Sequence, residues 1–149
     1  MEKLIEMLKS HEGEVKNNNG RHVAYKCPAG TWTVGIGRNI DPQNGLGLSD
    51  EEVDYLLARD IERVTTELTQ QYPWFLSLDS VRRSAMIQLG FNLGVGSRLR
   101  GFKKALLAME QGDYKKASTE FLDSRWRKQV GARALEICDL IATGTYLVE

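Results

Sequence analysis

The 149-residue sequence has few of the residues that brace small extracellular or metal-binding domains. It contains two cysteines, two histidines and three prolines. Cys27 and Cys138 lie far apart in the sequence, so we expect two free thiols rather than a disulfide. Neither cysteine stands in a metal-binding spacing, and we therefore expect no metal ion and no other cofactor.

Long apolar runs are also missing. No stretch approaches the roughly 18 apolar residues that a transmembrane helix needs. The opening MEKLIEMLK is charged every few positions, which predicts no signal peptide, no stable membrane association and synthesis in the cytoplasm. Hydrophobic residues make up 42% and charged residues 27% of the chain, as in an ordinary globular protein. We expect one autonomously folding domain over residues 1–149.

The chain has no net charge, but its charges are unevenly distributed. Residues 1–79 carry 8 basic and 13 acidic side chains, and residues 80–149 carry 12 basic and 7 acidic ones. The basic half could attract an anionic polymer such as peptidoglycan or nucleic acid, or its charges could simply be solvated. Because no nucleic-acid-binding motif is present, we expect no nucleic-acid partner.

The N-terminal third predicts a short helix and then a small sheet. Apolar residues at helical spacing predict a helix over residues 2–11, with Glu12 just past its end. Residues 24–38 alternate in the manner of strands, and the Cys-Pro-Ala-Gly segment at 27–30 predicts their hairpin turn. An antiparallel sheet is expected there.

The remainder predicts helices. Ser49 and Glu52 have the spacing of a capping box, followed by an apolar stripe up to residue 71. After residue 80 all apolar patterns are helical. The fold class is therefore α+β with two lobes and a cleft between them. We expect a sheet lobe at 13–48, a linking helix at 49–71, and a helical lobe at 72–149 that includes the N-terminal helix.

Glu12 is the first candidate for chemistry. Cleavage of a glycosidic bond needs a carboxylic acid that protonates the leaving oxygen, and a second group across the sugar. Glu12 lies where the first helix meets the sheet lobe, and partial burial there would keep its carboxyl group protonated. The alternative is a solvated glutamate at a helix end.

Five sequence blocks carry a resemblance to a known family. The chain resembles the T4-type phage lysozymes (endolysins), glycoside hydrolase family 24, in blocks that occur in order over nearly its full length. They are HEG at 11–13, AYKCPAGTWTVGIGR at 24–38, SLDSVRRSA at 77–85, SRW at 124–126 and TGTY at 143–146.

The resemblance implies a lysozyme-like fold and an active site. The family combines a Glu at the end of the first helix, an Asp or sometimes a Cys on the sheet lobe, and a Thr six positions further on. Glu12, Cys27 and Thr33 occupy these places. Their implied roles are general acid, activator of the attacking water, and hydroxyl group that orients this water. The chain departs from the commoner pattern at Cys27 and in about seven extra residues before it, roughly 16–22.

Further roles follow from the same resemblance. Arg133 aligns with an Arg that holds the catalytic Glu in place. Arg38 and Asp60 align with a structural ion pair between the sheet lobe and the linking helix. Phe91 and Asn92 match positions that line the substrate cleft, although a packing role for Phe91 is a close alternative, and Asn stands where Gln is more familiar.

Each of these assignments has a plainer alternative. Cys27 could be a small side chain packed beside a turn, and Thr33 an ordinary strand residue. Cys138 falls on an apolar helix face, where we expect a core residue. Trp32, Trp74 and Trp126 are assigned to packing rather than to sugar binding.

The expected function is hydrolysis of the β-1,4 bond between N-acetylmuramic acid and N-acetylglucosamine by a monomeric muramidase. The expected partner is the peptidoglycan glycan strand. The enzyme would wait in the host cytoplasm until a holin-type pore admits it to the cell wall. Two alternatives stay open: a lytic transglycosylase, and a non-hydrolytic peptidoglycan-binding protein on the same scaffold.

Overall fold

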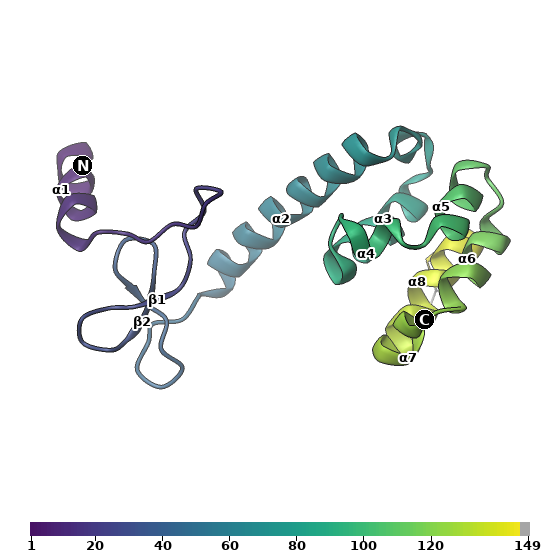
Figure 1. Ribbon diagram of the computed structural model, residues 1–149. Coiled ribbons are helices and arrows are strands. Elements are labelled where there is room, and N and C mark those ends of the chain that lie inside the picture. Colours follow the sequence, from purple (N-terminus) through teal and green to yellow (C-terminus); the bar gives the residue numbers. More distant parts are fainter. Residues whose placement is uncertain (147–149) are drawn as a thin grey trace. The chain divides into compact units, whose positions relative to one another are not determined.

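The computed structural model describes residues 1–146 (Figure 1). The chain forms two compact units, Met1–Tyr55 and Leu56–Glu149. A three-stranded antiparallel sheet lies in the first unit, and the second is helical. This composition confirms the predicted α+β class. The division between the units falls within one long helix, and each unit is described by itself.

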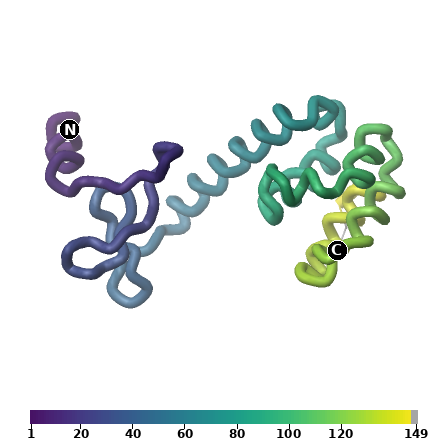
Figure 2. The backbone as a smooth tube through the Cα atoms, viewed as in Figure 1, coloured from purple at the N-terminus to yellow at the C-terminus, as the bar shows by residue number. Residues whose placement is uncertain are grey.

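The first unit contains one helix and the sheet. Helix α1 spans Glu2–Glu12, one residue further than the sequence predicts, and ends at Gly13. The strands are β1 (Tyr25–Lys26), β2 (Trp32–Val34) and β3 (Arg38–Asn39), in the order β1-β2-β3. The predicted hairpin turn joins β1 to β2. Long loops before β1 and after β3 can be followed in Figure 2.

Hydrophobic burial contributes little to the first unit. No residue of α1 is buried, and the apolar face predicted for it is open, with Leu4 59%, Ile5 43% and Leu8 44% exposed. Among residues 1–55 only Thr33 is buried. The unit is therefore held mainly by backbone hydrogen bonds and turns.

Helix α2 (Asp50–Gln71) begins at the predicted capping box. The Ser49 amide donates to Glu52 Oε1 at 2.9 Å, and the Glu52 amide donates to Ser49 Oγ at 3.1 Å. The apolar stripe of α2 is only partly buried. Val64 and Leu68 enter the core, whereas the earlier apolar residues of the stripe, from Val53 to Ile61, are 40–47% exposed.

The second unit is built from short helices that follow a 3-10 turn. They are η1 (Pro73–Ser77), α3 (Ser80–Leu93), α4 (Ser97–Arg100), α5 (Lys103–Glu110), α6 (Tyr114–Leu122), α7 (Arg125–Val130) and α8 (Ala132–Thr143). Glycines end α3 and α8, as the sequence predicts. Helix α6 packs on α5 and α8, and α3 also packs on α8.

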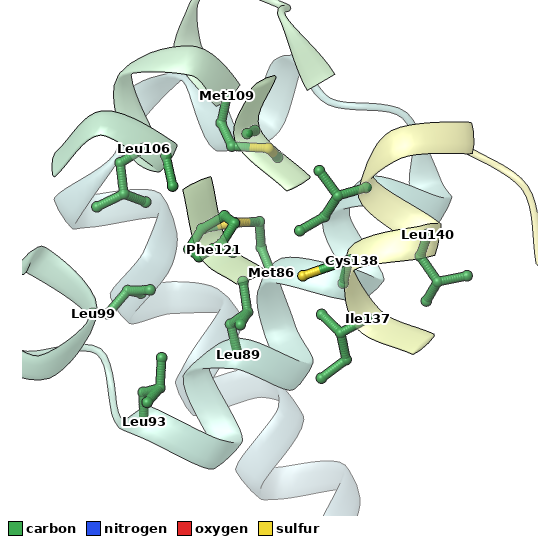
Figure 3. Close-up of a cluster of buried hydrophobic side chains, with 14 of the residues drawn as sticks. Met86, Leu89, Leu93, Leu99, Leu106, Met109, Phe121, Ile137, Cys138 and Leu140 are labelled. Carbon is green, nitrogen blue, oxygen red and sulfur yellow. The ribbon is translucent and has the colours of Figure 1, made fainter. Parts of the chain in front are cut away.

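A single hydrophobic core fills this unit (Figure 3). Phe121 and Met86 are fully buried within it. Cys138 is confirmed as a core residue, and burial, with the nearby Asp139 charge, raises the pKa of its thiol to about 12. Leu107 and Leu135 lie beside the buried faces of their helices and are 52% and 43% exposed.

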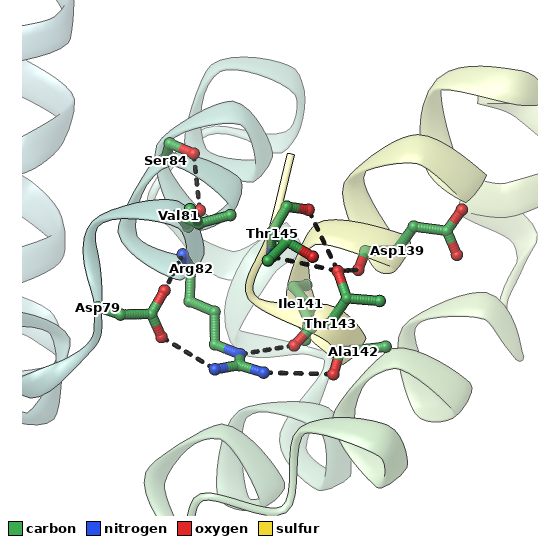
Figure 4. A network of polar contacts seen from close by, with 9 residues as sticks. All are labelled: Asp79, Val81, Arg82, Ser84, Asp139, Ile141, Ala142, Thr143 and Thr145. Atoms are coloured by element: carbon green, nitrogen blue, oxygen red, sulfur yellow. Dashed lines mark hydrogen bonds and ion pairs between the residues drawn. The ribbon is translucent and has the colours of Figure 1, made fainter. Parts of the chain in front are cut away.

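Arg82 joins the start of α3 to the end of α8 (Figure 4). Its Nε donates to the Ile141 carbonyl at 2.7 Å and its Nη2 to the Ala142 carbonyl at 3.2 Å. Its Nη1 pairs with Asp79, the N-cap of α3, at 3.0 Å. The guanidinium group also lies 3.7 Å from the centre of the Tyr114 ring. The arginine thus satisfies carbonyls that a helix end leaves free.

We expect Arg82→Ala to lower the free energy of unfolding by about 2–3 kcal/mol, because two partly buried carbonyls lose a charged donor. Arg83→Ala is the matched control, since no hydrogen bond or ion pair of the neighbouring Arg83 side chain is seen among residues 1–146. Urea denaturation of both variants measures the difference. Equal effects would contradict the role of Arg82.

Candidate functional site

Glu12 is the last residue of α1 and precedes the sharp chain reversal at Gly13, where φ is +71°. The side chain is exposed. The partial burial expected from the sequence is therefore not found within residues 1–55, because α1 contributes no buried residue. The carboxyl group instead lies against the turn between β2 and β3.

That contact is with Gly37, in the turn between β2 and β3. A Cβ atom built on Gly37 would lie 2.7 Å from Glu12 Oε2 and 3.1 Å from its carboxyl carbon. Real Cβ atoms do not approach this closely, so the Glu12 carboxyl group occupies space that only glycine leaves free. Gly37 also has a φ of +70°, which favours glycine for conformational reasons.

A hollow of about 310 Å³ opens beside this contact. It is lined by Ile5, Leu8, Lys9, Glu12, Ile36 and Gly37. Apolar side chains of α1 thus face the β2–β3 turn across a space that contains the Glu12 carboxyl group. The hollow is of the size of small-molecule sites.

Cys27 begins the β1–β2 turn, at the other end of β2. The Cys27 amide donates to the Thr31 carbonyl at 2.9 Å, and the Gly30 amide donates to the Cys27 carbonyl at 2.8 Å. The thiol is partly exposed. Its pKa is lowered, first by the Thr31 amide and then by the Ala29 amide, which both donate toward the sulfur.

Thr33 lies near Cys27. Its hydroxyl donates to the Thr31 carbonyl at 3.0 Å, and hydrogen bonding between the Thr33 hydroxyl and the thiol also lowers the Cys27 pKa. The alternating pattern of β2 predicts that its apolar residues, rather than Thr33, are buried. In the structure Thr33 is buried and Trp32 is 43% exposed. The structure therefore brings Cys27 and Thr33 together, while Glu12 lies beside the turn at the other end of β2.

The ion pair between Arg38 and Asp60 stays a prediction, because the two residues belong to different units. Arg38 Nη2 pairs with Glu52 Oε2 at 2.6 Å, and its Nη1 donates to the Gly47 carbonyl at 3.0 Å. Asp60 faces Arg63 on its own helix at 3.7 Å. The capping box holds Glu52 at the first turn of α2, within reach of β3. Within the first unit, Arg38 thus joins β3 to the first turn of α2 through Glu52.

The other predicted residues lie in the second unit. Asn92 accepts a 2.6 Å hydrogen bond from the indole nitrogen of Trp126, which is buried as predicted. Phe91 is 38% exposed, and Arg133 is exposed near the start of α8. Their roles toward substrate and Glu12 stay predictions.

Sequence reasoning missed the contacts of Gly37 and Glu52. The Gly-Ile-Gly-Arg segment that contains Gly37 belongs to a block that carries the family resemblance. The sequence indicates Glu52 only as part of the capping box with Ser49. Nothing in the spacing of either residue indicates a partner remote in sequence. Among residues 1–146, no group of three His, Cys, Asp or Glu side chains could hold a metal ion.

Comparison with known proteins gives the family. The family model for phage lysozyme matches residues 15–138. The chain belongs to the phage lysozyme family. The matched stretch contains Cys27, Thr33 and Arg133, and it begins just after Glu12. At the level of the family, the chain is a peptidoglycan-lytic enzyme.

Several curated relatives agree with this assignment. The chain is 32% identical to an endolysin of Acyrthosiphon pisum secondary endosymbiont phage 1 over 127 residues, covering 85% of the chain and 79% of the relative. It is 27% identical to probable T4-type lysozyme 1 of Dictyostelium discoideum, with 95% of each covered. A SAR-endolysin of Haemophilus phage HP1 is 30% identical over 64% of the chain and 47% of that relative. Within residues 1–146, no helix has the length and apolar character to span a membrane.

We expect Gly37→Ala to lower the rate of cell-wall lysis about 10- to 100-fold, because the new methyl group displaces the Glu12 carboxyl group. Gly35→Ala is the matched control. Gly35 has a similar φ of +63°, but a Cβ there would meet nothing within 4 Å. Both variants should lose similar stability, so lysis rates per folded molecule isolate the contact. Equal rates would mean that Gly37 matters only for its backbone conformation.

Proposed function

We propose that this chain hydrolyses the β-1,4 bond between N-acetylmuramic acid and N-acetylglucosamine in peptidoglycan. The observation that carries the proposal is the cluster at the start of the β1–β2 turn. There the Cys27 thiol faces the Thr33 hydroxyl and two backbone amides, and its pKa is lowered. A packing cysteine does not need hydrogen-bond donors, whereas a thiolate does.

In the proposed reaction Glu12 gives its proton to the glycosidic oxygen as the bond to the anomeric carbon breaks. A water molecule forms the new bond to this carbon, and Cys27 as thiolate takes the proton of this water. The Thr33 hydroxyl orients the water. Alternatively the thiolate attacks the anomeric carbon itself, and water then releases the sugar. Intact-protein mass spectrometry separates the two routes, because only the second forms a glycosyl adduct on Cys27.

The remaining assignments belong to the same proposal. Arg133 holds the Glu12 side chain, and Phe91 and Asn92 line the cleft that receives the glycan strand. Asn92 can present only part of its amide to a sugar, since Trp126 already occupies its oxygen. The enzyme acts as a monomer. It reaches the wall from the host cytoplasm through a holin-type pore, and the endolysin relatives support release to the cell wall.

The experiment is a turbidity assay on permeabilised Gram-negative cells, followed by mass analysis of the released muropeptides. Hydrolysis predicts products with a reducing end. Products lighter by one water would identify a lytic transglycosylase instead. Binding to the wall without any product would identify a non-hydrolytic binding protein.

We expect Glu12→Gln to lower the lysis rate at least about 100-fold while the fold is unchanged, because the amide has the shape of the acid but cannot donate its proton. Circular dichroism checks the fold and turbidity the activity. Glu14→Gln is the control, since Glu14 contacts Lys16 at 3.2 Å and has no assigned role in the reaction. Residual activity above about a tenth of wild type would remove Glu12 from the role of general acid.

We expect alkylation of Cys27 to stop lysis and Cys27→Ala to cost at least about 100-fold, whereas Cys27→Asp retains substantial activity. As pH rises and alkylation becomes faster, the fraction of lysis activity lost should equal the fraction of Cys27 that is alkylated. Cys138→Ala is the control, because the buried Cys138 thiol, with its pKa raised to about 12, reacts slowly.

If alkylated protein or Cys27→Ala still clears cells at the wild-type rate, Cys27 only packs beside the turn. Asp41, the nearest carboxylate beyond the sheet in sequence, then becomes the candidate for the second group, and Asp41→Asn the next variant. The Asp41 carboxylate accepts from the Gln43 amide at 3.0 Å.

A further inference from the structure

The first unit contains the same tight turn twice. In the turn from Asn17 to Arg21, the Asn17 amide donates to the Arg21 carbonyl at 2.9 Å and the Gly20 amide donates to the Asn17 carbonyl at 3.0 Å. In the turn from Cys27 to Thr31, the two equivalent bonds are 2.9 and 2.8 Å long. Gly20 and Gly30 occupy the same place, with φ of +76° and +81°.

The first side chain of each turn faces the same two amides. Asn17 Oδ1 accepts from the Asn19 amide at 2.9 Å and from the Arg21 amide at 3.1 Å. In the second turn the equivalent amides belong to Ala29 and Thr31, and hydrogen bonding from these two amides is the main cause of the lowered Cys27 pKa. A turn of this geometry therefore offers two donors to an acceptor at its first residue.

We propose that the Cys27–Thr31 turn is a preformed cradle that holds the side chain of residue 27 as an anion, and that Gly30 is the positioning residue that turns the Thr31 amide toward it. The role of this cradle in catalysis rests on the proposed function. Its effect on the ionisation of residue 27 does not, because that ionisation can be measured without any substrate.

The groups around the Cys27 sulfur show that backbone amides, rather than charged side chains, lower the pKa of its thiol. The main donors that favour the thiolate are the Thr31 and Ala29 amides, and neither amide titrates near neutral pH. The adjacent cation, Lys26, lies over the Trp32 ring at 5.3 Å. No charged side chain contributes to the lowered Cys27 pKa.

Gly30→Ala tests the cradle directly, with Gly20→Ala in the equivalent turn as its matched control. Each substitution strains a left-handed position at which a Cβ would meet nothing within 4 Å. Iodoacetamide labelling of Cys27 is followed by peptide mass spectrometry from pH 5 to pH 10. We expect Gly30→Ala to slow labelling at pH 7 at least about threefold and to move the rate profile to higher pH, while Gly20→Ala leaves both unchanged.

A second variant, Cys27→Asp, tests the cradle without a thiol. It gives a result even if Gly30→Ala does not fold. The carboxyl group that Cys27→Asp introduces should accept both amides, so its pKa, measured by NMR titration, should fall below that of an ordinary Asp. A lowered folded-state pKa means that Cys27→Asp gains stability over Cys27→Asn at neutral pH. This gain is lost as pH falls through the folded pKa.

The outcomes separate the cradle from the proposed function. Equal labelling profiles for Gly30→Ala and Gly20→Ala, or an ordinary pKa for the new carboxyl group, would overturn the cradle whatever the lysis rates. Wild-type lysis by Cys27→Ala would overturn the catalytic role and leave the cradle standing. With both correct, the lysis rate of Gly30→Ala falls in step with its labelling rate.

Discussion

The 2.8 Å hydrogen bond from the Gly30 amide to the Cys27 carbonyl closes the turn on which the candidate site depends. Gly30 is in the left-handed conformation in this turn, with a φ of +81°, and the Thr31 amide that follows it is the group proposed to face residue 27. The first unit buries so little that no hydrophobic core could impose this geometry. Backbone donors and acceptors must do so, and their directional bonds position the thiol more narrowly than apolar contact would.

The second unit is held in a different way. Its helices share a closed core around Phe121, and Arg82 fastens the last helix of the described chain to the start of α3. Two blocks that carry the family resemblance, at 77–85 and 143–146, meet at this arginine. Tyr146 extends the contact through a 2.9 Å hydrogen bond to Ser84. These blocks are therefore explained by helix packing rather than by chemistry at a sugar.

Features encoded locally could be predicted from the sequence. The capping box at Ser49, the turn at Cys27 and the core position of Cys138 each depend on a few neighbouring residues, and each was confirmed. Arg38 shows the limit, because its partner depends on which carboxylate of α2 the loop after β3 brings within reach. The contact of Glu12 with Gly37 is a second case, since glycine offers no side chain from which a partner could be inferred. The buried state of Thr33 is a third, because strand alternation alone favoured its apolar neighbours.

The same turn occurs at Asn17 and at Cys27, but only the turn at Cys27 has a proposed role in catalysis. Both turns offer two amides to their first side chain, so the cradle alone does not make a catalytic group. What differs is the strand that follows. Only the second turn leads into β2, where Thr33 adds a hydroxyl near the sulfur and the strand ends at the turn that holds Glu12. Asn17 carries no charge and fills its cradle as a structural acceptor. In the same cradle the pKa of the ionisable Cys27 thiol is lowered, and a thiolate at this place is the group that we propose to activate water.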